Sequence, residues 1–323
     1  MRISPKILVC FILVCSGLNS RAQNETYLLP FDNRIEINPA LAGLNKNSSY
    51  HTGNQYSYLN SEETYNIFYA TWDAYSPKLK GGVALNFSQG MLSKQNITTT
   101  SLGFYYSGFP IKISDSKILF TAGTDVLAAT KHWAVAFLNN VIPHDNDALI
   151  QQGESFFRYY IFKPKFGFLW TNNSLQIGVT STVLHTRNVA YSLIEPTTTL
   201  GYTLYVSKKM DNRVRDLYSR PFEMSPELIV FYREEVTIAR LRLLAEYTDK
   251  TWGAFIQNDF TNHITTLGGT IGYRHNFMRF NLNAGMGIPG TSDYNAFMCE
   301  LSFNIIVPPF SHSKYNPWAP PKR

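Results

Sequence analysis

Apolar and polar residues alternate along most of this chain with a period of two. In the stretch 197–208, for example, Leu200, Tyr202 and Leu204 alternate with Gly201 and Thr203. Successive side chains of a β-strand point to opposite faces, so each such stretch has one apolar face and one polar or small face. Fourteen segments carry the pattern, with 117–129 and 226–233 the weakest: 48–58, 63–74, 80–89, 98–109, 117–129, 161–171, 174–185, 197–208, 226–233, 236–247, 250–259, 263–273, 278–287 and 295–307. The pattern predicts an all-β protein.

The length and number of these segments predict a transmembrane antiparallel β-barrel of about 14 strands over residues 48–307. About ten residues are enough for a tilted strand to cross a bilayer. An even number of strands brings both ends of the wall to one rim, and only a closed barrel satisfies every backbone group in lipid. Beyond residue 22 the sequence has no apolar run of 18 residues that would cross as a helix.

The links between segments differ in length. Residues 171–174 form a tight polar turn, whereas 130–160 and 208–225 are long and polar. Outer-membrane barrels have short turns at the periplasmic rim and longer loops outside the cell. We therefore expect both long links at the outer rim.

Composition separates a membrane barrel from a soluble β-sandwich or propeller, which also alternate. Charged residues make up 16% of the chain and aromatic residues 15%, against about 25% charged residues in soluble domains. No repeat of propeller length is present. Aromatic residues near segment ends fit the girdles at membrane interfaces: Tyr58, Tyr75, Phe109, Trp170, Tyr247, Trp252 and Tyr273.

Residues 1–22 have the layout of a secretory signal peptide. Basic Arg2 and Lys6 precede a short apolar stretch, and small Ser20 and Ala22 precede a cleavage point before residue 23. The alternative is a lipid anchor on Cys15, but that residue follows Leu-Val instead of the small residue usual at such sites.

Net charge and cysteine content indicate which partners and which covalent cross-links to expect. The formal net charge is +6, and removal of the signal segment with Arg2, Lys6 and Arg21 leaves +3. The sequence has no basic stripe, so we expect no nucleic-acid partner. Cleavage leaves Cys299 as the only cysteine, which excludes an internal disulfide.

The sequence carries none of the short motifs of hydrolases, metalloproteases or nucleotide-binding enzymes. We therefore expect no enzyme activity, no cofactor and no metal site. A membrane hydrolase with a His–Ser pair formed across strands is an alternative that the sequence leaves open.

One charged set stands out on the segment 236–247. Arg240, Arg242 and Glu246 share one face, opposite the apolar Leu241 and Leu243. If the apolar face meets lipid, the three charges line the lumen. The interpretation we favour is a salt-bridged ladder that fills the barrel, and the alternative is a site for a polar or anionic ligand.

Residues 23–47 form an irregular segment before the first strand. It contains Asn38, Pro39, Ala40, Leu41, Ala42 and Gly43. Proline fixes its own φ and holds the preceding residue out of the helical region, and glycine permits positive φ. Small Ala40 and Ala42 allow close packing. We expect this motif to close the periplasmic mouth or to enter the lumen as a plug.

This motif resembles the start of the PorP/SprF family of outer-membrane proteins, which is associated with type IX secretion and gliding motility in Bacteroidota. Further stretches are similar to hairpins of that family: 80–87, 98–110, 226–230, 252–254 and 294–306. The resemblance covers nearly the whole mature chain, and its most specific part is the motif 38–43.

The resemblance implies a scaffold or anchor in the outer-membrane lipid. Its partners would be secreted type IX cargo or adhesin C-terminal domains, or components of the periplasmic and outer-membrane secretion ring. The even number of strands, and not the resemblance, places the Pro-rich residues 308–323 in the periplasm. There they would form a tail that contacts a partner through Tyr315, Trp318, Lys322 and Arg323, and the alternative is a disordered tail without a partner. The alternative function is an outer-membrane channel for polar solutes.

Overall fold

The computed structural model describes residues 30–44, 46–60, 63–92, 97–113, 116–132, 156–172, 174–188, 197–212, 222–233, 236–261, 263–288 and 296–307. Two short helices, α2 (Arg34–Ile37) and η1 (Pro39–Leu41), precede the strands. The strands are β1 (Ser48–Asn60), β2 (Glu63–Ser76), β3 (Gly81–Leu92), β4 (Ile97–Ile113), β5 (Ser116–His132), β6 (Phe156–Thr171), β7 (Leu175–Asn188), β8 (Thr197–Lys208), β9 (Met210–Asn212), β10 (Phe222–Arg233), β11 (Val236–Tyr247), β12 (Lys250–Asp259), β13 (Ile264–His275), β14 (Met278–Ile288) and β15 (Phe297–Val307).

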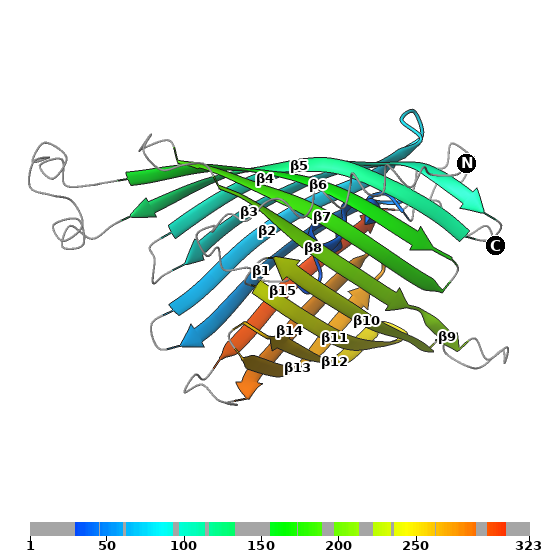
Figure 1. Cartoon of the computed structure of the whole chain (residues 1–323). Coiled ribbons are helices and arrows are strands. Elements are labelled where there is room, and N and C mark those ends of the chain that lie inside the picture. Colours follow the sequence, from blue (N-terminus) through cyan, green and yellow to red (C-terminus); the bar gives the residue numbers. More distant parts are fainter. Residues whose placement is uncertain are drawn as a thin grey trace, which may run out of the picture.

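The strands form one closed antiparallel barrel (Figure 1). Each long strand pairs with its neighbours in sequence, and β1 pairs with β15 from Ser48↔Val307 to Tyr58↔Phe297 to close the ring. The short β9 lies beyond the end of β8 and pairs with β10. The fourteen-stranded barrel predicted from the alternation is confirmed, including the two weakest segments, which are β5 and β10.

The polarity of the wall is reversed relative to a soluble protein. On β11, Leu241 and Leu243 are 52% and 42% exposed, whereas Arg240 and Arg242 are each 1% exposed. On β4, Leu102 is 62% exposed and faces away from the interior. A strand between lipid and a filled lumen has this arrangement. Among the helices of the described ranges, none is both long and apolar enough to cross a membrane.

Strands β4, β5 and β6 have 17, 17 and 16 residues, more than the roughly ten that a tilted strand needs to cross the bilayer. β5 therefore reaches His132, and β6 begins at Phe156, inside the predicted link 130–160. The residues by which β5 and β6 exceed the predicted segments show no clear alternation of apolar and polar side chains. Where a strand extends past the bilayer, its backbone is still hydrogen-bonded to the neighbouring strands, but its outer face no longer meets lipid and need not be apolar.

The prediction that both long links lie at one rim is wrong. β5 ends at the rim opposite the two ends of the barrel wall, but β8 and β9 end at the same rim as those two ends. Three crossings separate the two links, and an odd number of crossings must place them at opposite rims. Most links at the rim of the wall ends are short, such as the one after β6, where Asn172 Oδ1 accepts hydrogen bonds from the amides of Ser174 and Leu175. The links after β1 and β10, at the opposite rim, are equally short, but that rim also carries the longest link, between β5 and β6.

Candidate functional site

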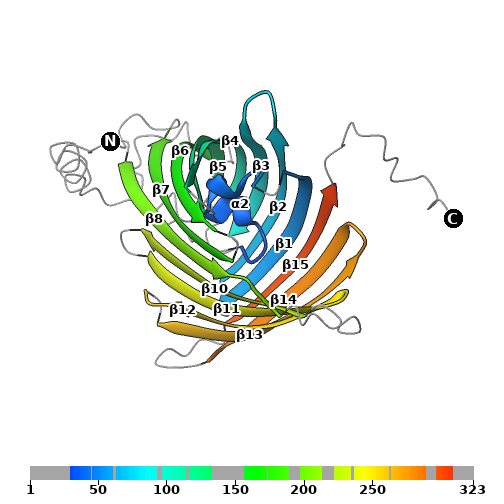
Figure 2. The same cartoon turned by 90° about the vertical axis from the view of Figure 1, so that its right-hand side faces the viewer.

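Residues 30–44 run inside the barrel, and Figure 2 shows α2 within the ring of strands. The segment expected to be irregular thus contains a turn of α-helix and a turn of 3-10 helix. Ile35, Ile37 and Leu41 pack with apolar side chains that the wall points inward, among them Tyr105 and Leu169. We call residues 30–44 the inner segment. Its apolar face is buried against one side of the barrel interior.

Asn38 connects the two helices and contacts the wall. Its backbone is extended, with φ −146° and ψ 106°, as expected for a residue before proline. Its Oδ1 accepts a hydrogen bond from the amide of Ala40 at 2.9 Å, and its Nδ2 donates to the carbonyl of Phe168 at 3.1 Å. Gly167 and Gly178 make room for this side chain, because a Cβ at either position would lie within 2.8 Å of it.

The end of the motif packs backbone against backbone. Gly43 has φ +61°, and its amide donates to Asp73 Oδ2 at 2.9 Å. A Cβ on Gly43 would lie 2.7 Å from the Cα of Gly82, and a Cβ on Gly82 would lie 1.9 Å from the carbonyl oxygen of Ala42. Only glycine at both positions allows this approach.

The start of the inner segment is held by charged and polar groups of the late strands. Asp32 accepts hydrogen bonds from Arg242 at 3.1 Å, Asn281 at 3.0 Å, Asn283 at 3.2 Å and Ser302 at 2.5 Å. These four residues come from β11, β14 and β15. A buried carboxylate with this many donors is fully compensated.

Phe31, the neighbour of Asp32, is enclosed on the same side. Glu300 accepts the backbone amides of Phe31 and Asp32 at 2.8 and 3.1 Å. Arg240 donates to the carbonyl of Pro30 at 2.6 Å and lies over the Phe31 ring at 4.1 Å from its centroid. Both backbone and side chain are therefore fixed, the ring by a cation–π contact.

A second charged group holds the other side of α2. Lys165 Nζ lies 2.7 Å from Glu36 and 2.9 Å from Asp125. Asn86 donates to the second Glu36 oxygen at 3.0 Å. The inner segment is thus tied by ion pairs to β6 as well as to β11, which lie apart around the ring (Figure 2).

The two acidic residues of the inner segment differ in their electrostatics. Burial alone raises the pKa of Asp32, but the charge of Arg242 and the hydrogen bonds from Ser302 and Asn281 more than offset this, so the pKa falls below its ordinary value. Burial also raises the pKa of Glu36, and there the opposing charge of Lys165 does not restore it, partly because Asp125 is close.

We compared the sequence with models of known protein families. The sequence matches the family described as type IX secretion system membrane protein PorP/SprF over residues 20–305. The chain belongs to the PorP/SprF family. The resemblance noted from the motif 38–43 is thereby confirmed. A search of curated proteins finds no match to this sequence.

Solved structures share the barrel fold with this PorP/SprF protein at low identity. The toluene transporter TbuX of Ralstonia pickettii has a TM-score of 0.50 and 8% identity, over 84% of this chain and 93% of that one. Omp33 of Acinetobacter baumannii has a TM-score of 0.44 and 7% identity, over 80% and 98%. CdiB from Acinetobacter baumannii has a TM-score of 0.47 and 10% identity, and the match covers 80% of this chain but only 60% of CdiB.

Family and fold together make this protein an outer-membrane β-barrel of the type IX secretion system. The apolar outer face described above is the surface that meets lipid. Among the described residues, no group of three or more His, Cys, Asp or Glu side chains is arranged to hold a metal ion.

The charged set of β11 divides between two places in the PorP/SprF barrel. Arg240 and Arg242 point inward and contact the inner segment, and Arg242 also pairs with Glu227 at 3.0 Å. Glu246 lies nearer the rim and pairs with Arg279. Arg242 and Glu246 thus have ion-pair partners in the same chain, whereas Arg240 contacts the Pro30 carbonyl and the Phe31 ring.

Sequence reasoning missed the partners of these arginines. Asp32, Glu36, Lys165 and Glu300 were not singled out, although the last two occupy inward positions of alternating segments. A local signal also existed for α2, because Asn33 caps the helix by accepting the amide of Glu36 at 3.4 Å and Asn followed three residues later by Glu is a capping pattern.

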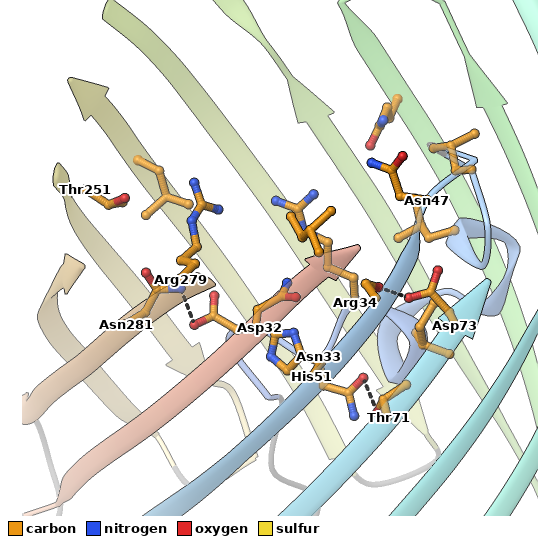
Figure 3. Close-up of a pocket in the computed structure, with 18 of the residues that line it drawn as sticks. Asp32, Asn33, Arg34, Asn47, His51, Thr71, Asp73, Thr251, Arg279 and Asn281 are labelled. Carbon is orange, nitrogen blue, oxygen red and sulfur yellow. Dashed lines mark hydrogen bonds between the residues drawn. The ribbon is translucent and has the colours of Figure 1, made fainter. Parts of the chain in front are cut away.

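A cavity of about 190 Å³ adjoins the inner segment, and Figure 3 shows residues that line it. Lining side chains come from the inner segment (Asp32, Arg34) and from the wall (His51, Arg279, Asn281). The predicted signal peptide 1–22, the tail 308–323 and its residues Tyr315, Trp318, Lys322 and Arg323 lie outside the described residues.

Proposed function

We propose that this type IX secretion barrel works as a scaffold or anchor and not as an enzyme or an open pore. Its partners would be the C-terminal domains of secreted cargo or adhesins at the cell surface, or components of the periplasmic ring. The rim that carries both ends of the wall, at Ser48 and Val307, would face the periplasm because the longest link, between β5 and β6, lies at the opposite rim.

The observation that carries this proposal is the inner segment. It occupies the lumen and is tied to the wall by the Asp32–Arg242 pair at 3.1 Å and the Glu36–Lys165 pair at 2.7 Å. Partly open charge pairs contribute little, but buried ones are costly to break once formed. A barrel filled in this way offers its rims and loops to partners and does not offer a wide aqueous path.

The motif 38–43 would organise this filling. Asn38 and Gly43 contact different strands of the wall, at Phe168 in β6 and Asp73 in β2. Changing Pro39 and Gly43 together is therefore expected to reduce secretion while the barrel still assembles. Secretion at the wild-type level in this double variant would remove the motif from the mechanism.

The experiment that tests the scaffold is a mild-detergent pull-down of the tagged protein from outer membranes, with partners identified by mass spectrometry. A tagged outer-membrane barrel of unrelated family serves as the control. We expect secreted proteins with a common C-terminal domain, or periplasmic ring components, to be enriched only with this chain. A barrel recovered without such partners would contradict the proposal.

A channel for polar solutes is the second candidate. The polar cavity beside the inner segment favours it. The packing of Ile35, Ile37 and Leu41 against the wall speaks for the scaffold, because an apolar core inside the lumen excludes water and ions.

A further inference from the structure

An aromatic row crosses the outer face of β10–β15 near the rim of the wall ends, on one side of the ring (Figure 2). Its members are direct register partners from each strand to the next, and they lie on the same face as the exposed Leu241 and Leu301. Aromatic side chains in such rows mark the level of the lipid headgroups. We call this row the belt: Phe222, Tyr247, Lys250, Tyr273, Phe280 and Phe303.

The belt has no aromatic counterpart at the other end of β11–β13. There the outward-facing register partners are Ala239, Asn258 and Thr265. Between the two rows, the outer face of β12 carries the exposed apolar Trp252 and Ile256. Lys250 is therefore the first outward residue of β12 beyond the apolar surface that meets lipid.

Lys250 is the one charged member of the belt, and its side chain is exposed. Within the described ranges it forms no ion pair. The adjacent acid, Asp249, accepts hydrogen bonds from the hydroxyls of Thr248, at 3.0 Å, and Tyr273. The charge of Lys250 has a smaller influence on this carboxylate than these two hydrogen bonds. The ammonium therefore keeps its three N–H donors for groups outside the chain.

The belt selects its occupant by position and by charge. A side chain on the outer wall at headgroup level meets lipid before it meets a soluble protein, and an ammonium there attracts anionic headgroups. Tyr247, the register partner of Lys250 on β11, adds a hydroxyl that has no hydrogen-bond partner among the described residues. The phosphate of a phospholipid offers acceptor oxygens, which match these donors.

We propose that the belt binds a phospholipid by its headgroup, with the phosphate on the Lys250 ammonium and the Tyr247 hydroxyl. The acyl chains would lie against Trp252 and Ile256, deeper on the same face of β12. The inference rests on the proposed function for one point, the periplasmic orientation of this rim. It needs that orientation because the periplasmic leaflet of an outer membrane consists of phospholipid and the outer leaflet of lipopolysaccharide.

The test is native mass spectrometry of the purified full-length protein in detergent, titrated with dioleoylphosphatidylglycerol and with dioleoylglycerol, which has the same acyl chains and no phosphate. We expect the phosphate-bearing lipid to bind more tightly. Lys250→Gln should weaken its binding about fivefold, as for the loss of one basic side chain near a membrane surface, and Lys250→Arg should retain it. The matched control is Lys117→Gln at the same rim, because Lys117 alternates with the outward-facing Ile118 and Phe120 of β5.

Tyr247→Phe keeps the ring and removes the hydroxyl, so it should weaken the same lipid by a smaller factor and supplies a second variant. Equal binding of the two lipids, or an unchanged affinity in Lys250→Gln, would overturn the proposal. Tighter binding of lipopolysaccharide would also overturn it and would reverse the orientation of the barrel. Loss of protein partners from Lys250→Gln without loss of lipid would assign Lys250 to a protein instead. Pull-downs that recover secretion partners from a protein without lipid preference would reject the belt site and leave the scaffold role intact.

Discussion

Asp32 and Arg242, which are 210 residues apart, form an ion pair of 3.1 Å inside the barrel. Arg242 also lies 3.0 Å from Glu227 and is 1% exposed. One guanidinium therefore compensates two carboxylates, one from the inner segment and one from the wall. This relationship makes the position of the inner segment depend on a residue near the other end of the sequence.

Arg242→Met is expected to destabilise the barrel strongly. The change leaves Asp32 and Glu227 without their cation, and removal of one partner of a buried pair costs about 3–5 kcal/mol. The measurement is the midpoint of thermal unfolding in detergent, followed by electrophoretic heat-modifiability. Arg279→Met is the matched control: its pair with Glu246 is partly exposed, so about 1 kcal/mol or less is expected. Equal losses in both variants would contradict the assigned role of Arg242.

Glu36 is expected to make the stability of the docked inner segment depend on pH. Its pKa in the docked state is raised by burial above the ordinary 4.5. The raised pKa of Glu36 therefore contributes to the stability of the docked state fully below pH 4.5, and this contribution is lost as the pH rises through the raised pKa. Asp32 has a lowered pKa, so its contribution is lost only at lower pH, outside this window.

The matched variant for that prediction is Glu36→Gln, which resembles the protonated form at every pH. We expect the unfolding midpoints of wild type and variant to converge near pH 4.5, with the wild type falling below the variant toward neutral pH. Thermal scans of both proteins between pH 4.5 and 8 provide the measurement. A wild-type protein that becomes more stable than the variant as the pH rises would show that the Lys165 pair dominates.

Gly82→Ala is expected to displace the inner segment. The new Cβ would lie 1.9 Å from the carbonyl oxygen of Ala42, and forced overpacking costs about 1–3 kcal/mol. Protease cleavage within residues 30–44 of the folded barrel should become faster. At Gly269 the nearest atom to a new Cβ is the Gly253 oxygen at 3.5 Å, so Gly269→Ala should leave cleavage unchanged. Unchanged cleavage in Gly82→Ala would mean that the motif is not held against β3.

The wild-type protein is expected to be silent in planar bilayers, because the inner segment occupies the lumen. Asp32→Ala combined with Glu36→Ala removes the two carboxylates by which the inner segment pairs with Arg242 and Lys165, and leaves Glu227 and Asp125 as their partners in the wall. The double variant should release the inner segment and produce discrete conductance steps. Glu246→Ala, which changes a pair outside the inner segment, is the control and should stay silent. Regular conductance of the wild type would favour the channel.

The sequence alone predicted the wall of this protein well. Strands β11 and β12 begin and end where the alternation of apolar and polar residues begins and ends, because the pleat places successive side chains on opposite faces. Leu241 and Arg242 could be assigned to opposite faces for the same reason. The rim of each link also follows from counting crossings, and the error over 208–225 came from not applying that count.

The tertiary structure decided what meets inside the barrel. Alternation states that Arg242 and Lys165 face inward, but it carries no information on which residue lies across the lumen. The pairs with Asp32 and Glu36 depend on strand register, on the closure of β1 against β15, and on the path of residues 30–44 through the ring. No local pattern encodes contacts over 129 or 210 residues, because they exist only once the barrel has closed around the inner segment.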